Sequence, residues 1–319
     1  MRLRLVPKNT NWDFFSQSKL WLGFSALLLI GSLVSFLMQG LNFGIDFRGG
    51  TTIRTESTQT IDVAAYRQAI GDLQLGDVTI SEVFDPTFAA DQHVAMIRIQ
   101  AQEGQEAVSA DTVKSVLAAL QSVAPDIEFV SVESVGPKVS GELIQKAIIA
   151  VVLAIAAVLV YIWLRFEWQF AVGAVAALIH DVLLTIGVFS VVQIKFDLAI
   201  IAALLTIVGY SLNDTVVVFD RVRENLRKYK KKPLQEVLNL SINETLSRTV
   251  MTSVTTLLAL IALFILGGDV IRGFVFAMIW GVIIGTYSSV FVASSTLLRL
   301  GVKRDWSKPN AEAGTQVPQ

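Results

Sequence analysis

Three ionisable side chains interrupt stretches of the sequence that are otherwise apolar enough to lie in a lipid bilayer. They are Asp214, Asp181 and Arg248. A charged group is costly in the hydrocarbon region and is a functional candidate by default, so each of the three is a candidate for binding or moving an ion. Asp214 lies six residues before Asp220, the first charge beyond its apolar run, which places it roughly 9 Å inside the membrane. Asp181 lies eleven residues beyond Phe170, roughly 16 Å into its own run.

Asp214 and Arg248 are predicted to lie on neighbouring antiparallel helices at similar depth, because one basic segment connects their apolar runs. A buried carboxylate next to a guanidinium stays ionised, and its affinity for a proton changes when that partner moves away. The pair is therefore predicted to be a proton relay whose state depends on the position of Arg248. A carboxylate can also bind Na⁺, so the coupling ion stays open between H⁺ and Na⁺.

Other polar residues accompany this pair on the same runs. Residues three or four positions apart share one face of a helix, so several of them are predicted to lie near Asp214 or Arg248. The candidates for a polar relay, or for packing around it, are Asp181, Asn213, Ser211, Tyr210 and Thr252.

The same residues also allow interpretations without transport. Asp214 and Arg248 would then form a static tie between two helices. Arg248, near a helix end, would instead extend its charged head to the membrane surface. Asp181 and His180 would only hydrogen-bond to a neighbouring helix.

The composition restricts the class of protein. Of the 319 residues, 53% are hydrophobic and only 17% are charged, against about a quarter in soluble domains, which predicts a membrane protein. The net charge of −1 gives no reason to expect nucleic-acid binding. The absence of cysteine, the presence of only two histidines and the lack of a GxxxxGK[ST] loop argue against a metal site and against ATP hydrolysis. We therefore expect no enzyme activity and no cofactor, with an ion gradient as the energy source.

Six apolar runs have the length of about 20 residues that a membrane-spanning helix needs. They are Leu20–Met38, Leu143–Leu164, Phe170–Val192, Leu198–Phe219, Val250–Leu266 and Phe274–Leu300. The first run outlasts the apolar core of a cleavable signal and is followed by no A-x-A site, so an uncleaved helix is favoured.

Basic residues gather on one side of these runs, which predicts that this side is cytosolic. The N-terminal tail (1–19), the basic loop (220–247) and the C-terminal tail (301–319) would then be cytosolic, the last of them without ordered structure. The loop residues predicted to fix this topology and to contact anionic lipid, with contact to a partner protein as the alternative, are Arg221, Arg223, Arg227, Lys228, Lys230, Lys231 and Lys232.

The long segment 39–142, between helix 1 (20–38) and helices 2–6 (143–300), is predicted to be a folded external domain. Its alternating and helical apolar patterns follow one another in the order β-α-β-β-α-β. This is the order of the ferredoxin-like arrangement. The predicted fold is therefore a polytopic α-helical membrane protein with six transmembrane helices and an α+β domain between helices 1 and 2.

Several sequence blocks resemble the SecD/SecF family of protein-export membrane subunits, within the RND-like superfamily. The blocks are GYSLNDTVVVFDRVREN at 209–225, LNFGIDFRGGT at 41–51, VGPKVSGEL at 135–143, YIWLRFEWQFAVGA at 161–174, LIHDV at 178–182 and LSRTVMTS at 246–253. The resemblance covers about residues 15–305, and the external loop of about a hundred residues fits the SecF branch of the family. It implies a six-helix RND-like half, with Asp214 as the relay aspartate and Arg248 as the arginine thought to pair with it. It gives Asp181 no firm role.

The resemblance also implies a function and partners. The family assists preprotein export through the SecYEG channel of the bacterial inner membrane, using the proton-motive force late in or after the SecA-driven step. SecD would supply the complementary six-helix half, YajC and YidC are further partners, and unfolded preprotein would be met on the periplasmic side. The expected mechanism transmits protonation of Asp214 through helices 1 and 2 to the domain at 39–142. The alternatives are a proton-driven exporter of small hydrophobic molecules and a passive translocon scaffold.

Overall fold

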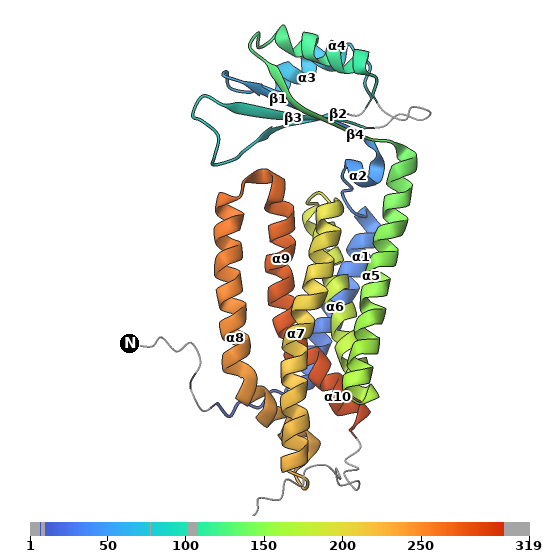
Figure 1. Ribbon diagram of the computed structural model, residues 1–319, viewed down its shortest axis with the longest axis vertical. Coiled ribbons are helices and arrows are strands. Elements are labelled where there is room, and N and C mark those ends of the chain that lie inside the picture. The colour runs from blue at the N-terminus through green and yellow to red at the C-terminus, as the bar shows by residue number, and fades with distance from the viewer. Residues whose placement is uncertain (1–6, 8–9, 77, 101–107, 303–319) are drawn as a thin grey trace, which may run out of the picture.

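The computed structural model describes residues 7, 10–76, 78–100 and 108–302, and it has two parts (Figure 1). A bundle of long helices forms one part, and an α/β domain lies across one end of the bundle. The expected tail at 301–319 falls almost wholly outside the described residues.

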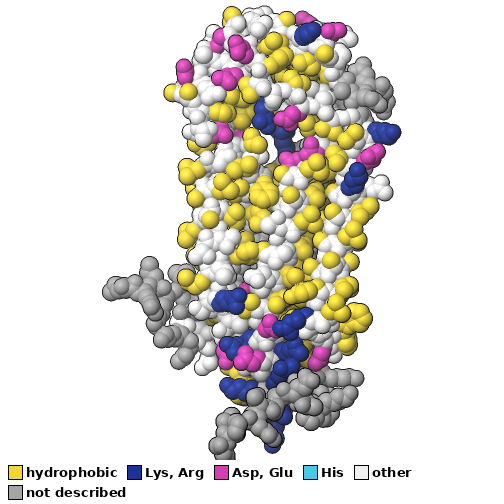
Figure 2. Space-filling model, viewed as in Figure 1, with side chains coloured by type: hydrophobic (Ala, Val, Ile, Leu, Met, Phe, Trp, Pro, Cys, Tyr) yellow, Lys and Arg dark blue, Asp and Glu magenta, His cyan; other side chains and the backbone are white. Residues whose placement is uncertain are grey.

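Within the described ranges, six helices are long and apolar enough to cross a membrane. They are α1 (Ser18–Gln39), α5 (Pro137–Arg165), α6 (Trp168–Val192), α7 (Leu198–Lys228), α8 (Leu234–Leu266) and the helix that starts as α9 (Gly268–Ser288). The last helix continues through a π-helical turn, η1 (Ser289–Ala293), into α10 (Ser294–Leu300). The predicted six-helix membrane fold is confirmed. Figure 2 shows hydrophobic side chains along the visible face of the bundle, with Lys and Arg gathered at its lower end.

The segment 220–247, predicted to be a loop, is mostly helical. Helix α7 continues to Lys228 and α8 begins at Leu234, so only five residues separate the two helices. Arg, Lys and Glu are good helix formers, and apolar residues recur among them at helical spacing. Val222 on α7 and Leu238 on α8 accordingly lie in one buried cluster. The low hydropathy of this segment indicates where the bilayer ends. Helices α7 and α8 continue past that point and form a helical hairpin.

The external domain is a four-stranded antiparallel sheet with two helices on the face away from the bundle (Figure 1). Its elements are β1 (Gly50–Ser57), α3 (Val63–Gly71), β2 (Val78–Val83), β3 (His93–Gln100), α4 (Ala110–Gln121) and β4 (Glu128–Val135). The strand order is β2-β3-β1-β4, which agrees with the predicted β-α-β-β-α-β connection. Because strand residues alternate between faces, Ile53 and Ile97 point into the core under α3 and α4. Their neighbours Thr52, Arg54 and Arg98 point toward the bundle.

The chain does not pass directly from α1 into β1. Residues Ile45–Arg48 form a short helix, α2, and the chain enters β1 only after it. Gly49 and Gly50 have φ of +74° and +137°, conformations that a side chain disfavours strongly. The glycine pair therefore makes the sharp change of direction between membrane helix α1 and the sheet.

The bundle depends on a close crossing of α7 and α9. Gly281 and Gly285 lie one turn apart on α9, against Ile207 and Ser211 of α7. A Cβ on Gly281 would overlap the side chain of Ile207, which is 1% exposed, and one on Gly285 would lie 3.0 Å from Ser211 Cβ. Small residues four apart allow such backbone approach in membranes, where lipid supplies no hydrophobic force between helices.

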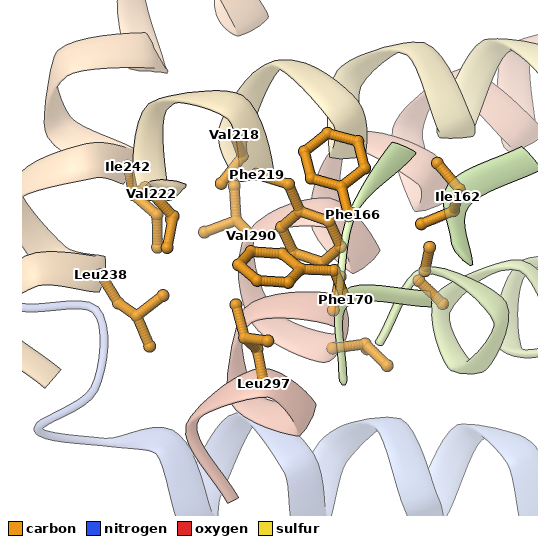
Figure 3. Packing of buried hydrophobic residues seen from close by; sticks show 14 of the residues in the cluster. Ile162, Phe166, Phe170, Val218, Phe219, Val222, Leu238, Ile242, Val290 and Leu297 are labelled. Atoms are coloured by element: carbon orange, nitrogen blue, oxygen red, sulfur yellow. The ribbon is translucent and has the colours of Figure 1, made fainter. Parts of the chain in front are cut away.

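An aromatic cluster holds together the half of the bundle that lies away from the external domain (Figure 3). Phe166 follows α5, Phe170 is in the first turn of α6, and Phe219 comes from α7. The ring of Phe170 lies 5.6 Å from that of Phe166 and 5.1 Å from that of Phe219. This packing fixes α7 against α6 just over one turn beyond Asp214.

We expect Gly281→Ala to destabilise the protein by about 1–3 kcal/mol, because the new methyl group overfills the α7–α9 contact. The matched control is Gly209→Ala on α7, where an added methyl group meets no atom within 4 Å. Thermal unfolding in detergent measures both variants. An unchanged midpoint for Gly281→Ala would show that the two helices do not depend on this contact.

Candidate functional site: two carboxylates held by adjacent serines

Asp214 is half-buried on α7, and both of its carboxylate oxygens accept hydrogen bonds from hydroxyl groups of other elements. Thr249 Oγ1 of α8 donates to Oδ1 at 2.6 Å, and Ser289 Oγ of η1 donates to Oδ2 at 2.7 Å. The carboxylate therefore connects α7, α8 and the end of the last helix. A carboxylate in hydrocarbon needs such donors because water is not available to it.

Asp181 on α6 is more deeply buried, with 1% of its surface exposed. Its Oδ2 accepts from Ser211 Oγ of α7 at 2.6 Å and from Ser288 Oγ of α9 at 2.7 Å. Its Oδ1 lies 2.9 Å from Nδ1 of His180, whose ring stacks on Tyr287. Asp181 thus has hydrogen-bond partners on three helices, a role that the sequence left open.

The two carboxylates are joined through consecutive residues of one helix. Ser288 donates to Asp181, and Ser289, the next residue, donates to Asp214. These serines lie where α9 passes into the π-helical turn η1, and π-turns inside helices occur often at functional sites. Gly285, one turn earlier, lets this part of the helix approach α7 closely enough for both contacts.

Arg248 does not pair with Asp214, contrary to the prediction. Among the described residues no ion pair within 4 Å joins them, and Arg248 is exposed. Successive helix residues point about 100° apart, so when Thr249 faces α7 its neighbour Arg248 must face elsewhere. Arg248 instead borders a surface cavity of about 280 Å³ where α7 and α8 form their helical hairpin, together with Asp220 and Glu244.

The other predicted polar residues divide between the site and the surface. Ser211 belongs to the site, although it serves Asp181 rather than Asp214. Tyr210 donates to Thr256 of α8 over a long 3.5 Å. Asn213 and Thr252 are exposed, and Thr252 donates to carbonyl groups of its own helix.

The basic residues of the predicted loop lie on the helical hairpin formed by α7 and α8. Arg221 forms ion pairs with Glu224 and Glu244, at 2.7 and 3.4 Å. Arg223 donates to the carbonyl oxygen of Arg165. Lys228 and Lys232 lie over the ring of Tyr229.

Sequence reasoning missed Thr249, Ser288 and Ser289. A signal for the serines was present, since Gly281, Gly285 and Ser289 repeat a small residue at every fourth position, the pattern of a close helix contact. Hydroxyl groups both donate and accept hydrogen bonds. The site can therefore hold two carboxylates and rearrange its hydrogen bonds when one of them gains a proton.

A six-helix bundle with buried carboxylates and an α+β domain inserted after its first helix defines a polytopic membrane transport protein. Comparison with known proteins narrows this class. Residues 115–303 match the family described as "Protein export membrane protein SecD/SecF, C-terminal", and residues 34–61 match the "SecD/SecF GG Motif", which contains Gly49 and Gly50.

Curated relatives agree with this match. The chain is 64% identical over 315 residues to the protein translocase subunit SecF of Cereibacter sphaeroides, covering 99% of this chain and 97% of the relative. It is 60% identical over 313 residues to SecF of Rhodobacter capsulatus, covering 96% and 94%. The chain belongs to the SecD/SecF family, in its SecF branch. It is a membrane component of the protein translocase and not an enzyme.

Solved structures of SecDF show the same architecture. The crystal structure of SecDF from Thermus thermophilus, titled a translocon-associated membrane protein, matches with a TM-score of 0.81 and 32% identity over 94% of this chain. A SecDF structure in a super-membrane-facing form matches with a TM-score of 0.69 and 33% identity. This chain spans only 40% of either SecDF chain.

We expect Ser288→Ala to destabilise the protein by about 1–3 kcal/mol, because buried Asp181 loses a donor that nothing replaces. Thr255→Val is the control, since the Thr255 hydroxyl donates only to carbonyl groups of its own helix and the side chain is exposed. Thermal unfolding of both variants in detergent gives the comparison. Equal effects of the two substitutions would remove Ser288 from the site.

Proposed function

We propose that this chain is the SecF subunit that, together with SecD, uses the proton-motive force to assist preprotein translocation across the bacterial inner membrane. It acts through SecYEG, late in or after the SecA-driven step, with both termini in the cytosol. The observation that supports this proposal is the carboxylate of Asp214, held by Thr249 and Ser289 inside the membrane region. H⁺ is the proposed coupling ion, and Na⁺ is the alternative.

Protonation of Asp214 is proposed to act on the α8–α9 hairpin. A neutral carboxylic acid is a weaker acceptor than a carboxylate, so its bonds to Thr249 and Ser289 weaken when a proton binds. Thr249 lies on α8, and Ser289 directly follows α9, so both arms of one hairpin respond to the same proton. Arg248 lies beside Thr249 at the cytosolic end and is proposed to move closer to Asp214 when the hairpin shifts.

The tip of this hairpin is bonded to the external domain. Phe84, just after β2, donates its backbone N–H to Asp269 Oδ2 at 2.8 Å, and the Asp269 N–H donates to the Phe84 carbonyl at 2.9 Å. Arg272 forms an ion pair with the same aspartate. The external domain is thus held by α8–α9 as well as by its covalent connections to α1 and α5. We propose that this contact, in addition to those two helices, transmits the movement.

The surface of α7 and α8 supports SecD as the partner. Asn213 and Arg248 are exposed at or near the level of the bilayer, where lipid cannot satisfy their polar groups. Helices of another subunit would cover them. The 60% of each SecDF chain that this chain does not span leaves room for a second, complementary half. The further partners YajC and YidC, and unfolded preprotein on the periplasmic side, belong to the same proposal.

Asp214→Asn is expected to abolish the part of preprotein export that depends on the proton-motive force, because the amide cannot take up the proton. The protein should still insert in the membrane, since the asparagine carbonyl oxygen still accepts from one of the two hydroxyl groups and its NH₂ group can donate to the oxygen of the other. The matched control is Asp220→Asn, six residues along α7, where the carboxylate only pairs with Arg165 at the surface. Export into inverted membrane vesicles, with and without an uncoupler, measures the effect. Normal gradient stimulation in Asp214→Asn would falsify the relay.

Asp269→Ala is expected to reduce the gradient-dependent part of export severalfold while leaving SecA-driven export unchanged, because the hairpin then loses a bond to the external domain. Asp91→Ala, an exposed position on the β2–β3 connection, is the control. The same vesicle assay applies. If Asp269→Ala keeps full gradient stimulation, the coupling passes through α1 and α5 alone.

A further inference from the structure

A cavity of about 480 Å³ lies between the sheet and the external end of the bundle, apart from the carboxylate site. Strands β1 and β3 form its roof, the connection between α6 and α7 forms part of its floor, and the start of α9 closes one side. Figure 2 shows Lys, Arg, Asp and Glu side chains gathered in the notch between the two parts of the molecule.

Three of the cations lining the cavity have no counter-ion in contact. Arg54 on β1, Arg98 on β3 and Lys195 from the floor line the space, and within the described part of the chain no carboxylate lies within 4 Å of their charged nitrogens. Burial and the positive charge of Arg98 lower the pKa of Lys195 to about 8. Burial likewise lowers the pKa of Arg98; the nearby carboxylate of Asp197 opposes this effect and Arg54 adds to it. Arg98 and Lys195 are therefore partly desolvated without a carboxylate in direct contact.

Most of the acids around the cavity are already engaged elsewhere. Asp46 accepts from the backbone N–H of Leu198 at 2.9 Å, and Asp197 caps the N-terminus of α7 through the N–H of Ile200 at 3.3 Å. Asp269 binds Phe84 and Arg272, as described above. Glu82 lies 3.4 Å from His93. Glu133 alone among the lining acids has no such bond in the described structure. All five acids keep their charge, so the lining is balanced overall by acids at a distance, while the three cations lack direct partners.

Unsatisfied donors point to the same cavity. The Nε atoms of Arg54 and Arg98 are buried without a hydrogen-bond partner, and so is Oγ1 of Thr52, whose side chain is 5% exposed. Thr52 lies directly opposite Arg98 in the β1–β3 pairing. Guanidinium groups match the oxygen atoms of phosphate in geometry and charge, and a hydroxyl group adds a further donor. An oxyanion bound in the cavity would be offered donors by these unsatisfied groups.

We infer that this cavity binds a phosphate group, held by Arg54, Arg98, Lys195 and Thr52. The apolar side chains of Phe264 and Phe274 also line the cavity, so its walls suit the glycerol and first acyl carbons of a phospholipid as well as a free ion. The ligand chemistry is the phosphate oxyanion, and its source is either an anionic phospholipid headgroup or inorganic phosphate. The site is separate from Asp214 and stands whether or not the protein couples proton flow.

The test measures thermal unfolding of the full chain with two probes. The first is inorganic phosphate in detergent, compared with chloride at equal ionic strength, and the second is a nanodisc of phosphatidylglycerol, compared with phosphatidylcholine. A ligand that binds only the folded state raises the midpoint as its concentration passes its dissociation constant. We expect a rise of several degrees with at least one probe. A rise with inorganic phosphate indicates a free-ion site, and a rise confined to phosphatidylglycerol indicates a lipid headgroup site.

Variants decide whether the rise comes from this cavity. Arg98→Gln and Lys195→Gln should each remove at least most of the rise, whereas Arg67→Gln, an exposed position on α3, should keep it in full. Without any probe, Arg98→Gln should unfold at the same or a higher temperature, because an unpaired buried cation is removed. The inference is overturned if neither probe raises the midpoint, if the rise survives in both cavity variants, or if Arg98→Gln without probe is strongly destabilised.

Discussion

A carboxylate inside a membrane must be given hydrogen-bond donors by the protein, and the arrangement of this bundle follows from that requirement. Asp181 and Asp214 lie on adjacent helices, and their side-chain partners come from α6, α7, α8 and the last helix. Five hydroxyl or imidazole groups must therefore converge at one depth. Only helices that approach very closely can bring them together, because a serine side chain reaches no further than one bond beyond its Cβ.

Glycine residues make that approach sterically allowed. Gly281 and Gly285 carry no Cβ where α9 meets α7, and Gly173 makes a similar contact between α6 and η1, with Ala293 O 3.0 Å from where its Cβ would lie. The polar centre and the glycine contacts thus depend on each other: the donors need short distances, and the short distances need small residues. The aromatic cluster around Phe219 then fixes the half of the same helices that lies away from the external domain.

Much of this fold could be predicted from the sequence. The length of an apolar run identifies a membrane-spanning helix, and the alternation of apolar and polar residues identifies a strand with one buried face. The site was predicted less well. Asp214 and Asp181 were found because charge in an apolar run is visible in sequence. The donor Thr249 was not predicted. Thr249 and Arg248 are consecutive, so which of them faces Asp214 depends on the rotation of α8 about its axis, and the sequence does not give that rotation. The short helix α2 was also missed, because four residues carry too little periodicity to be told from a strand.

The unbroken length of helices α7 and α8, which continue beyond their apolar segments, has a mechanical consequence. Lys228 lies fourteen residues beyond Asp214 on one continuous helix, a distance of roughly 21 Å along its axis. A tilt of about 10° pivoting at Asp214 would carry the Lys228 end of α7 sideways by roughly 4 Å, because the helix is unbroken over this length. This basic end lies at the end of the bundle opposite the α/β domain (Figure 1). A change of state at the buried carboxylates would therefore also change the shape of the surface at that end of the protein.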